Sequence, residues 1–157
     1  MVNADWDAPD AKEFSEPVAG TYTFRVTEPT EGSSTAGDYI RLVCENEDNP
    51  AWKLRENLYF TPKAMGMTNM RLRGLGVPKG LNPLRPHYFY GIIFQAICKA
   101  EKGKPNAQGK VYTNLSIDVF AKAEGFTGGI KLIVAGASMP TIDPTGKIVE
   151  PDDEVVF

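Results

Sequence analysis

Residues 52–60, WKLRENLYF, alternate between apolar and polar side chains along most of their length. A period of two is typical of a β-strand whose two faces lie in different surroundings. The predicted apolar face consists of Trp52, Leu54, Leu58 and Phe60. The opposite face consists of Lys53, Arg55, Asn57 and Tyr59. The stretch therefore predicts a strand with one side on a core and a basic, aromatic side toward solvent.

Two more alternating stretches precede this strand, at residues 20–26 and 39–44. The residues predicted to face the core in these strands are Tyr22, Phe24, Val26, Ile40, Leu42 and Cys44. Those predicted to face outward are Arg25, Tyr39 and Arg41. Turn-rich segments separate the three stretches, so three short strands in succession are expected.

The period changes at Thr61-Pro62. Thr is a favoured N-cap and Pro a favoured first helical residue, so a short helix is predicted from here to Arg73, ending at Gly74. Its apolar side chains are interpreted as core filling: Met65, Met67, Met70 and Leu72.

Strand patterns return after a loop rich in Gly and Pro. Residues 88–99 predict a long strand with Phe94, Ala96 and Cys98 on one face, and residues 111–120 predict its partner. The hairpin tip between them, residues 100–110, is basic. One more strand is expected at residues 129–135, and a turn at Asp143 is expected to close a hairpin over residues 142–149.

The order of elements is three strands, a helix and two strands. It predicts a mainly β fold, a five-stranded barrel of OB-fold type with one short helix between the third and fourth strands. A β-sandwich would leave that helix unexplained. The predicted organisation is an acidic lead-in (residues 1–19), the barrel (20–124), an extension (125–149) and an acidic tail (150–157). The extension is interpreted as an added strand, a dimer element or a linker.

The composition fits one folded domain, with 157 residues of which 42% are hydrophobic and 24% charged. No apolar run approaches the ~20 residues of a membrane-spanning helix. The first residues, MVNADWDAPDAKEF, lack the basic and apolar stretches of a signal peptide, so a cytoplasmic protein without a membrane partner is expected. Homo-oligomerisation stays open.

Enzymatic and metal chemistry are not predicted. The one histidine, His87, cannot form a His pair for a metal, and no Ser/His/Asp or Cys/His set is evident. The acidic run Asp5, Asp7 and Asp10 lacks the Gly and distal Glu of a calcium loop. The two cysteines, Cys44 and Cys98, are expected to be buried free thiols. The sequence indicates a non-catalytic protein without cofactors.

Charge is distributed unevenly along the chain. Residues 1–50 carry a net charge of −8, residues 51–124 carry +8 and residues 125–157 carry −3. Local fields govern contacts with polyanions, so the basic middle offers a nucleic acid a positive surface despite the acidic total. An uneven but merely solvated surface is the alternative interpretation.

Binding to a single strand requires cations along the phosphate backbone and flat rings on which unpaired bases stack. The outer face of residues 52–60 supplies both, neighbouring strands extend it, and the basic hairpin tip forms one wall of a groove. The predicted nucleic-acid-binding residues are Arg25, Tyr39, Arg41, Lys53, Arg55, Tyr59, Lys99, Lys102, Lys104, Lys110 and Tyr112. Taken singly, the tyrosines could be packing residues and the lysines solubility charges.

The last eight residues, EPDDEVVF, carry four carboxylate side chains and close on an aromatic ring. A ring beside negative charge is a chemistry by which short peptides are recognised. The predicted partner-binding residues are Asp152, Asp153, Glu154 and Phe157. A solvated tail is the alternative.

These residues carry two resemblances. The acidic terminus closing on Phe157 resembles the tails of bacterial and phage single-stranded DNA-binding proteins, which recruit replication and recombination enzymes through them. The stretch from residues 18–24, VAGTYTF, through residues 58–63, LYFTPK, to the hairpin ending near Asn114 resembles small phage proteins encoded beside recombination and replication genes. That resemblance implies an OB-fold protein that binds single-stranded DNA in the host cytoplasm and recruits replication or recombination proteins. The alternative is a phage structural or assembly protein with a small β-domain.

Overall fold

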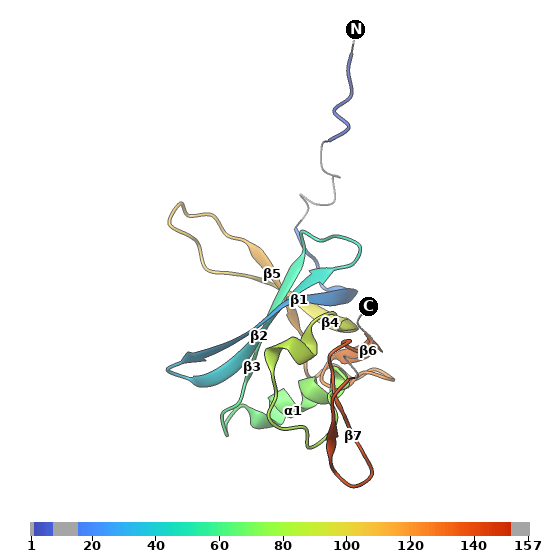
Figure 1. Ribbon diagram of the computed structural model, residues 1–157. Coiled ribbons are helices and arrows are strands. Elements are labelled where there is room, and N and C mark those ends of the chain that lie inside the picture. Colours follow the sequence, from blue (N-terminus) through green and yellow to red (C-terminus); the bar gives the residue numbers. More distant parts are fainter. Residues whose placement is uncertain (1, 8–15, 152–157) are drawn as a thin grey trace.

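The alternating stretches form strands in the computed structural model, which describes residues 2–7 and 16–151 (Figure 1). One sheet has six strands in the order β1-β2-β3-β5-β4-β6, and it closes partly into a ring because β1 also pairs with β4. The ring strands are β1 (Gly20–Ser34), β2 (Gly37–Asn46), β3 (Lys53–Tyr59), β4 (Ile93–Lys102) and β5 (Thr113–Ile117). The prediction of a mainly β, barrel-like fold with one short helix after the third strand is confirmed.

The long strand β1 pairs with two other strands of the ring. Its first part, from Gly20 to Arg25, pairs with β4, and the part from Phe24 to Ser34 pairs with β2. The register with β2 shifts between Val26 and Glu28, and such a bulge bends a strand. Beyond the bend β1, β2 and β3 extend as an arm, and the β4–β5 loop projects toward the same side of the molecule (Figure 1).

The contact between β3 and β5, called the seam below, has the fewest paired residues in the ring. These two strands are parallel and share one register pair, Leu54 with Leu115. Next to it a carboxylate takes the place of backbone pairing: Glu56 Oε1 accepts a hydrogen bond of 3.2 Å from the Ile117 backbone N–H. The other carboxylate oxygen lies 3.3 Å from the Arg71 guanidinium of the helix. The largely buried Glu56 carboxylate thus links β3 to β5 by a hydrogen bond and to α1 by an ion pair.

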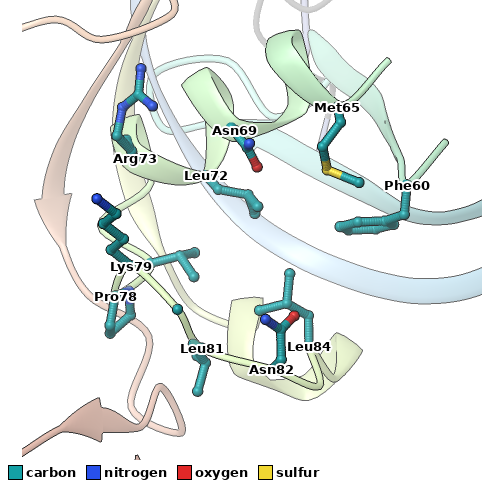
Figure 2. Close-up of a pocket in the computed structure, with 12 residues that line it drawn as sticks. Phe60, Met65, Asn69, Leu72, Arg73, Pro78, Lys79, Leu81, Asn82 and Leu84 are labelled. Atoms are coloured by element: carbon teal, nitrogen blue, oxygen red, sulfur yellow. The ribbon is translucent and has the colours of Figure 1, made fainter. Parts of the chain in front are cut away.

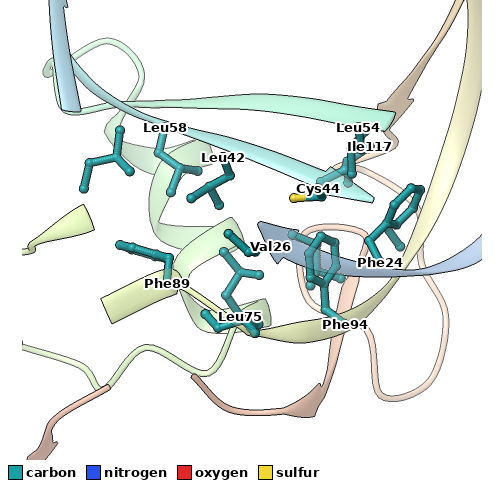
Figure 3. Close-up of a cluster of buried hydrophobic side chains, with 14 of the residues drawn as sticks. Phe24, Val26, Leu42, Cys44, Leu54, Leu58, Leu75, Phe89, Phe94 and Ile117 are labelled. Atoms are coloured by element: carbon teal, nitrogen blue, oxygen red, sulfur yellow. The ribbon is translucent and has the colours of Figure 1, made fainter. Parts of the chain in front are cut away.

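The core lies inside the ring and under the helix (Figure 3). The predicted inward residues Phe24, Val26 and Leu54 are fully buried, at 0% exposure. The other core predictions that are confirmed are Ile40, Leu42, Cys44, Leu58, Phe94, Ala96 and Cys98. The predictions for Tyr22, Trp52 and Phe60 are only partly correct, because these rings pack against the edge of the core and stay half-buried.

The helix, α1 (Met65–Gly74), begins later than predicted. Thr61 does not cap it; its Oγ1 accepts a hydrogen bond of 3.4 Å from the Ala64 N–H in a preceding turn. The interpretation of the methionines as core filling is also wrong, since the buried residues of α1 are Thr68 and Gly74. The Thr68 hydroxyl donates a 2.7 Å hydrogen bond to the Tyr59 carbonyl. The helix is therefore anchored on β3 by polar contacts, which a hydrophobic period cannot indicate.

The predicted strand at residues 88–99 is too long at its start. Residues Pro86–Phe89 form a 3₁₀ helix, η2, in which Tyr88 and Phe89 are both buried, and β4 begins at Ile93. Consecutive side chains of a strand point to opposite faces, so two buried neighbours fit a helical turn better than a half-buried strand. The partner predicted at residues 111–120 is likewise shorter, at Thr113–Ile117.

The extension adds to the sheet. Strand β6 (Ile130–Val134) pairs with β4 on the side opposite β1, which confirms the strand expected at residues 129–135. Strands β7 (Thr141–Ile142) and β8 (Ile148–Val149) form the expected hairpin. The Asp143 carboxylate accepts hydrogen bonds from the Thr145 hydroxyl and from the Lys147 and Thr145 backbone N–H groups, and these bonds lower the pKa of Asp143. The extension therefore contributes an added strand to the sheet.

Gly129, just before β6, lies close to the backbone of Asp118, just after β5, and a substitution there is expected to be strongly destabilising. Gly129 has φ +78°, and a Cβ there would lie against the Asp118 carbonyl oxygen. We expect Gly129→Ala to lower the free energy of unfolding by about 1 to 3 kcal/mol or more, because backbone strain adds to a steric clash. Guanidinium unfolding measures this. Gly109→Ala is the matched control, since Gly109 has φ +76° with open space around it. Equal losses in the two variants would contradict the clash.

Candidate nucleic-acid interface

The outer face of β3 carries the predicted cations. Lys53 and Arg55 are exposed, and the residues below them on the inner face, Leu54 and Leu58, are buried. Within residues 2–7 and 16–151, neither Lys53 nor Arg55 takes part in an ion pair. The alternation in residues 52–60 therefore presents both cations to solvent.

A groove of about 460 Å³ runs beside these cations over the β3/β5 seam. One wall is the β2–β3 turn with β3, and the other is the end of the β4–β5 loop with β5. The groove brings together four predicted site residues, which are Lys53, Arg55, Lys110 and Tyr112. The groove lies here because β3 and β5 are joined by only one register pair, which leaves a gap between the two strands.

On the wall formed by the β4–β5 loop, the ring of Tyr112 and the ammonium group of Lys110 lie next to each other. Tyr112 is 53% exposed, and the Lys110 Nζ lies 5.0 Å from its ring centroid. Glu16 of the lead-in also lines the groove, so three cations face one carboxylate there. A positive field next to an accessible ring is the combination that single-strand binding uses.

The second part of the site is an aromatic cluster farther along β2 and β3. The ring centroids of Tyr39 and Tyr59 are 5.4 Å apart, and the Arg41 guanidinium lies 5.4 Å from the Tyr39 centroid. Arg41 Nε donates a 3.0 Å hydrogen bond to Asn57 Oδ1. Asn57 is two residues from Arg55 on the same face, so the cluster continues the line of the groove by about 7 Å.

Four more predicted site residues belong neither to the groove lining nor to the aromatic cluster. Arg25 pairs with Glu47 at 3.2 Å, and Lys99 lies 3.9 Å from Glu101, so a carboxylate partly neutralises each cation. The exposed Lys102 and Lys104 belong to the end of β4 and the hairpin loop. Outward alternation and loop position place a cation on the surface, but they do not indicate its nearest acidic neighbour.

The structure adds residues that the sequence pattern assigned elsewhere. Trp52 was predicted on the apolar face, yet it lines the groove while its ring contacts Tyr22 edge to face at 5.6 Å. Thr113 and Asn114 of β5 supply polar groups on the opposite wall. Trp52 stands at the start of its strand, next to the β2–β3 turn, and alternation is a weak guide at strand ends.

The remaining predictions concern chemistry other than nucleic-acid binding. No group of three or more His, Cys, Asp or Glu side chains suited to a metal ion occurs in the described ranges. Cys44 and Cys98 are buried free thiols, as predicted, and burial raises the pKa of Cys98 to about 12. Asp5 accepts a hydrogen bond from the Asp7 N–H in a local turn, while Asp10 lies outside the described residues.

Two further findings bear on partners. Among the helices in the described part of the chain, none has the length and apolar character needed to cross a membrane. The predicted partner-binding residues of the tail lie outside the described residues; they are Asp152, Asp153, Glu154 and Phe157.

A scan against protein-family models found no match to this chain, and a search of curated proteins found none either.

Proposed function

We propose that this chain is an OB-fold protein that binds single-stranded DNA without sequence preference. The observation that carries the proposal is the groove over the β3/β5 seam, where Lys53, Arg55, Lys110 and Tyr112 gather from strands and a loop far apart in sequence. OB-folds bind oligonucleotides on the face of the second and third strands and on the loops beside it. The aromatic cluster on β2 and β3 belongs to that same face.

Assignment to the OB-fold is supported by the ring of β1, β2, β3, β5 and β4, with α1 inserted between β3 and β4. An OB-fold is a five-stranded, partly open barrel, and the sparse β3/β5 seam fits its open side. Strand β6 is then an addition to the barrel.

The chemistry accounts for binding without sequence readout. Lys53, Arg55 and Lys110 can contact phosphates, whose neutralisation releases counterions and makes binding sensitive to salt. Each base stacked on a ring contributes about 1 to 3 kcal/mol, and every base has a face to stack. Tyr112 and Trp52 line the groove, and the Tyr39–Tyr59 pair lies farther along β2 and β3, so more than one base can find a ring to stack on.

Fluorescence titration with poly-dT tests the proposal. We expect tight binding that weakens steeply as salt is raised, and much weaker binding to double-stranded DNA of the same length, whose bases are already stacked. No binding at low salt would contradict the proposal and favour the alternative of a phage structural or assembly protein. Mass spectrometry of purified virions would then detect the chain.

The exposed ring of the groove gives a more local test. We expect Tyr112→Ala to weaken poly-dT binding by about 1 to 3 kcal/mol, roughly 5- to 150-fold, because one stacked base loses its platform. Tyr112→Phe keeps the ring and is the matched control, with affinity close to that of the unsubstituted chain. Equal affinities for Tyr112→Ala and Tyr112→Phe would show that no base stacks there.

A role in phage DNA replication or recombination belongs to the same proposal and rests on the resemblance of residues 18–24 and 58–63. Recruitment of replication or recombination proteins by the acidic tail is also proposed, from the chemistry of residues 152–157. Deleting those residues is expected to leave poly-dT binding intact or tighter while the recruitment is lost.

A further inference from the structure

A second, apolar pocket of about 470 Å³ lies between α1 and the loop that follows it (Figure 2). Its walls are mostly apolar and include Phe60, Met65, Leu72 and Leu84. It sits away from the groove, and none of the residues that line the groove lines it. Core residues such as Val77 and Leu81 form part of its wall, and the proposed DNA site does not use this pocket.

The rim of the pocket is basic. Arg73 and Lys79 lie at one end, opposite Phe60 (Figure 2). None of the described residues that line the pocket is acidic. An apolar floor with cations at one end suits a ligand that carries apolar side chains next to carboxylates.

This chain contains such a segment. Residues 152–157, DDEVVF, carry three carboxylate side chains followed by two valines and a phenylalanine. The charge is opposite to that of the rim, and the apolar side chains match the apolar walls. The groove over the β3/β5 seam is also basic, but its lining contains more polar groups and so offers the valines and the ring less apolar contact.

The segment starts close to the pocket. Strand β8 pairs with β7, whose Ile142 side chain lies 3.9 Å from the position of a Cβ on Gly80, a residue of the pocket wall. Just after β8, Glu150 is held by a 3.2 Å hydrogen bond from the Tyr88 hydroxyl. Six residues beyond Pro151 can span about 20 Å when extended. Docking within one chain requires the apolar walls to lie within this length of Pro151.

We propose that residues 152–157 dock intramolecularly in the pocket between α1 and the following loop, with Phe157 among the apolar walls and the carboxylates toward Arg73 and Lys79. Docking would cover the apolar surface and withhold the segment from other proteins until a competitor displaces it. The inference stands independently of DNA binding.

The methyl signal of Met65 reports on the pocket. In the full chain labelled with ¹³C-methyl methionine, we expect Phe157→Ala to shift the Met65 signal, because the ring current of the docked phenylalanine is removed. The Met70 signal should not move, since Met70 lines a different hollow beside Phe120. Phe120→Ala is the matched control: it should shift the Met70 signal, because Phe120 and Met70 line the same hollow, and it should leave Met65 unchanged. An unchanged Met65 signal in Phe157→Ala would overturn the proposal.

Charge reversals locate the site. A fluorescent peptide of residues 150–157 should bind the Phe157→Ala chain, and Arg73→Glu with Lys79→Glu should weaken this binding by roughly tenfold. Lys53→Glu with Arg55→Glu should leave the peptide affinity unchanged; a loss there instead would place the segment in the groove and overturn the proposal.

The Met65 shift must also be independent of protein concentration. A shift that grows with concentration would mean that a second copy supplies the segment, which contradicts docking within one chain.

Discussion

Reversing both groove cations, Lys53→Glu with Arg55→Glu, is expected to weaken poly-dT binding by about 100-fold or more at roughly 100 mM salt. Both side chains are exposed and unpaired within the described ranges, so two attractions to phosphate become repulsions while the fold is left intact. The slope of log affinity against log salt should flatten by about 1.4, because each phosphate that a cation neutralises on a single strand contributes about 0.7. Fluorescence titration over a range of salt concentrations measures both quantities.

The matched control is another double reversal, Lys63→Glu with Lys147→Glu. Both residues are exposed and line neither the groove nor the pocket beside α1. The control has the same change in total charge, so it separates the long-range field from contacts within the groove. If control and groove variant lose affinity equally, the groove is not the binding site. Unfolding curves of both variants should match that of the unsubstituted chain.

The second large effect is expected at the ion pair between Glu56 of β3 and Arg71 of α1. Arg71→Met should lower the free energy of unfolding by about 3 to 5 kcal/mol, because it leaves the largely buried Glu56 carboxylate without its cation. The guanidinium also donates a 3.3 Å hydrogen bond to the Asn57 carbonyl, which the variant cannot make. Arg73→Met, on the same helix but exposed, is the matched control and should change stability by less than about 0.5 kcal/mol.

The destabilisation of Arg71→Met should depend on pH. Burial raises the pKa of Glu56, and the nearby Arg71 and the Ile117 N–H lower it in part. A raised folded-state pKa means that this group favours folding most below its unfolded-state pKa, and that the contribution declines as pH rises through the folded-state value. Without Arg71 the pKa rises further, so Arg71→Met should be more destabilised at about pH 8 than at about pH 5. Guanidinium unfolding at the two pH values measures this.

A double variant isolates the carboxylate. Glu56→Gln keeps an oxygen that can accept the Ile117 N–H but cannot ionise. Combined with Arg71→Met, it should recover part of the stability that Arg71→Met lacks at about pH 8 and reduce the difference between the two pH values. An equal pH dependence in the single and double variants would show that Glu56 is not its source.

Alternation in the sequence was sufficient to place the first three barrel strands, although β1 continues to Ser34 through a stretch predicted as a turn-rich segment. Alternation in residues 20–26, 39–44 and 52–60 placed Phe24, Leu42 and Leu54 in the core, because a strand with one face buried must repeat every two residues. The same rule put Lys53 and Arg55 on the outside. These are local properties of a pleated chain, and they do not depend on which strands are neighbours.

What only the tertiary structure decided is which outward residues share a site. Lys53 and Lys110 are 57 positions apart in sequence, and they line one groove because β3 and β5 meet at a seam with a single register pair. The same seam gives Glu56 its contact with the Ile117 N–H, and the packing of α1 on β3 gives it the contact with Arg71. Pairing of strands distant in sequence sets the groove and the Ile117 contact, and no local period records which distant partner a strand will meet.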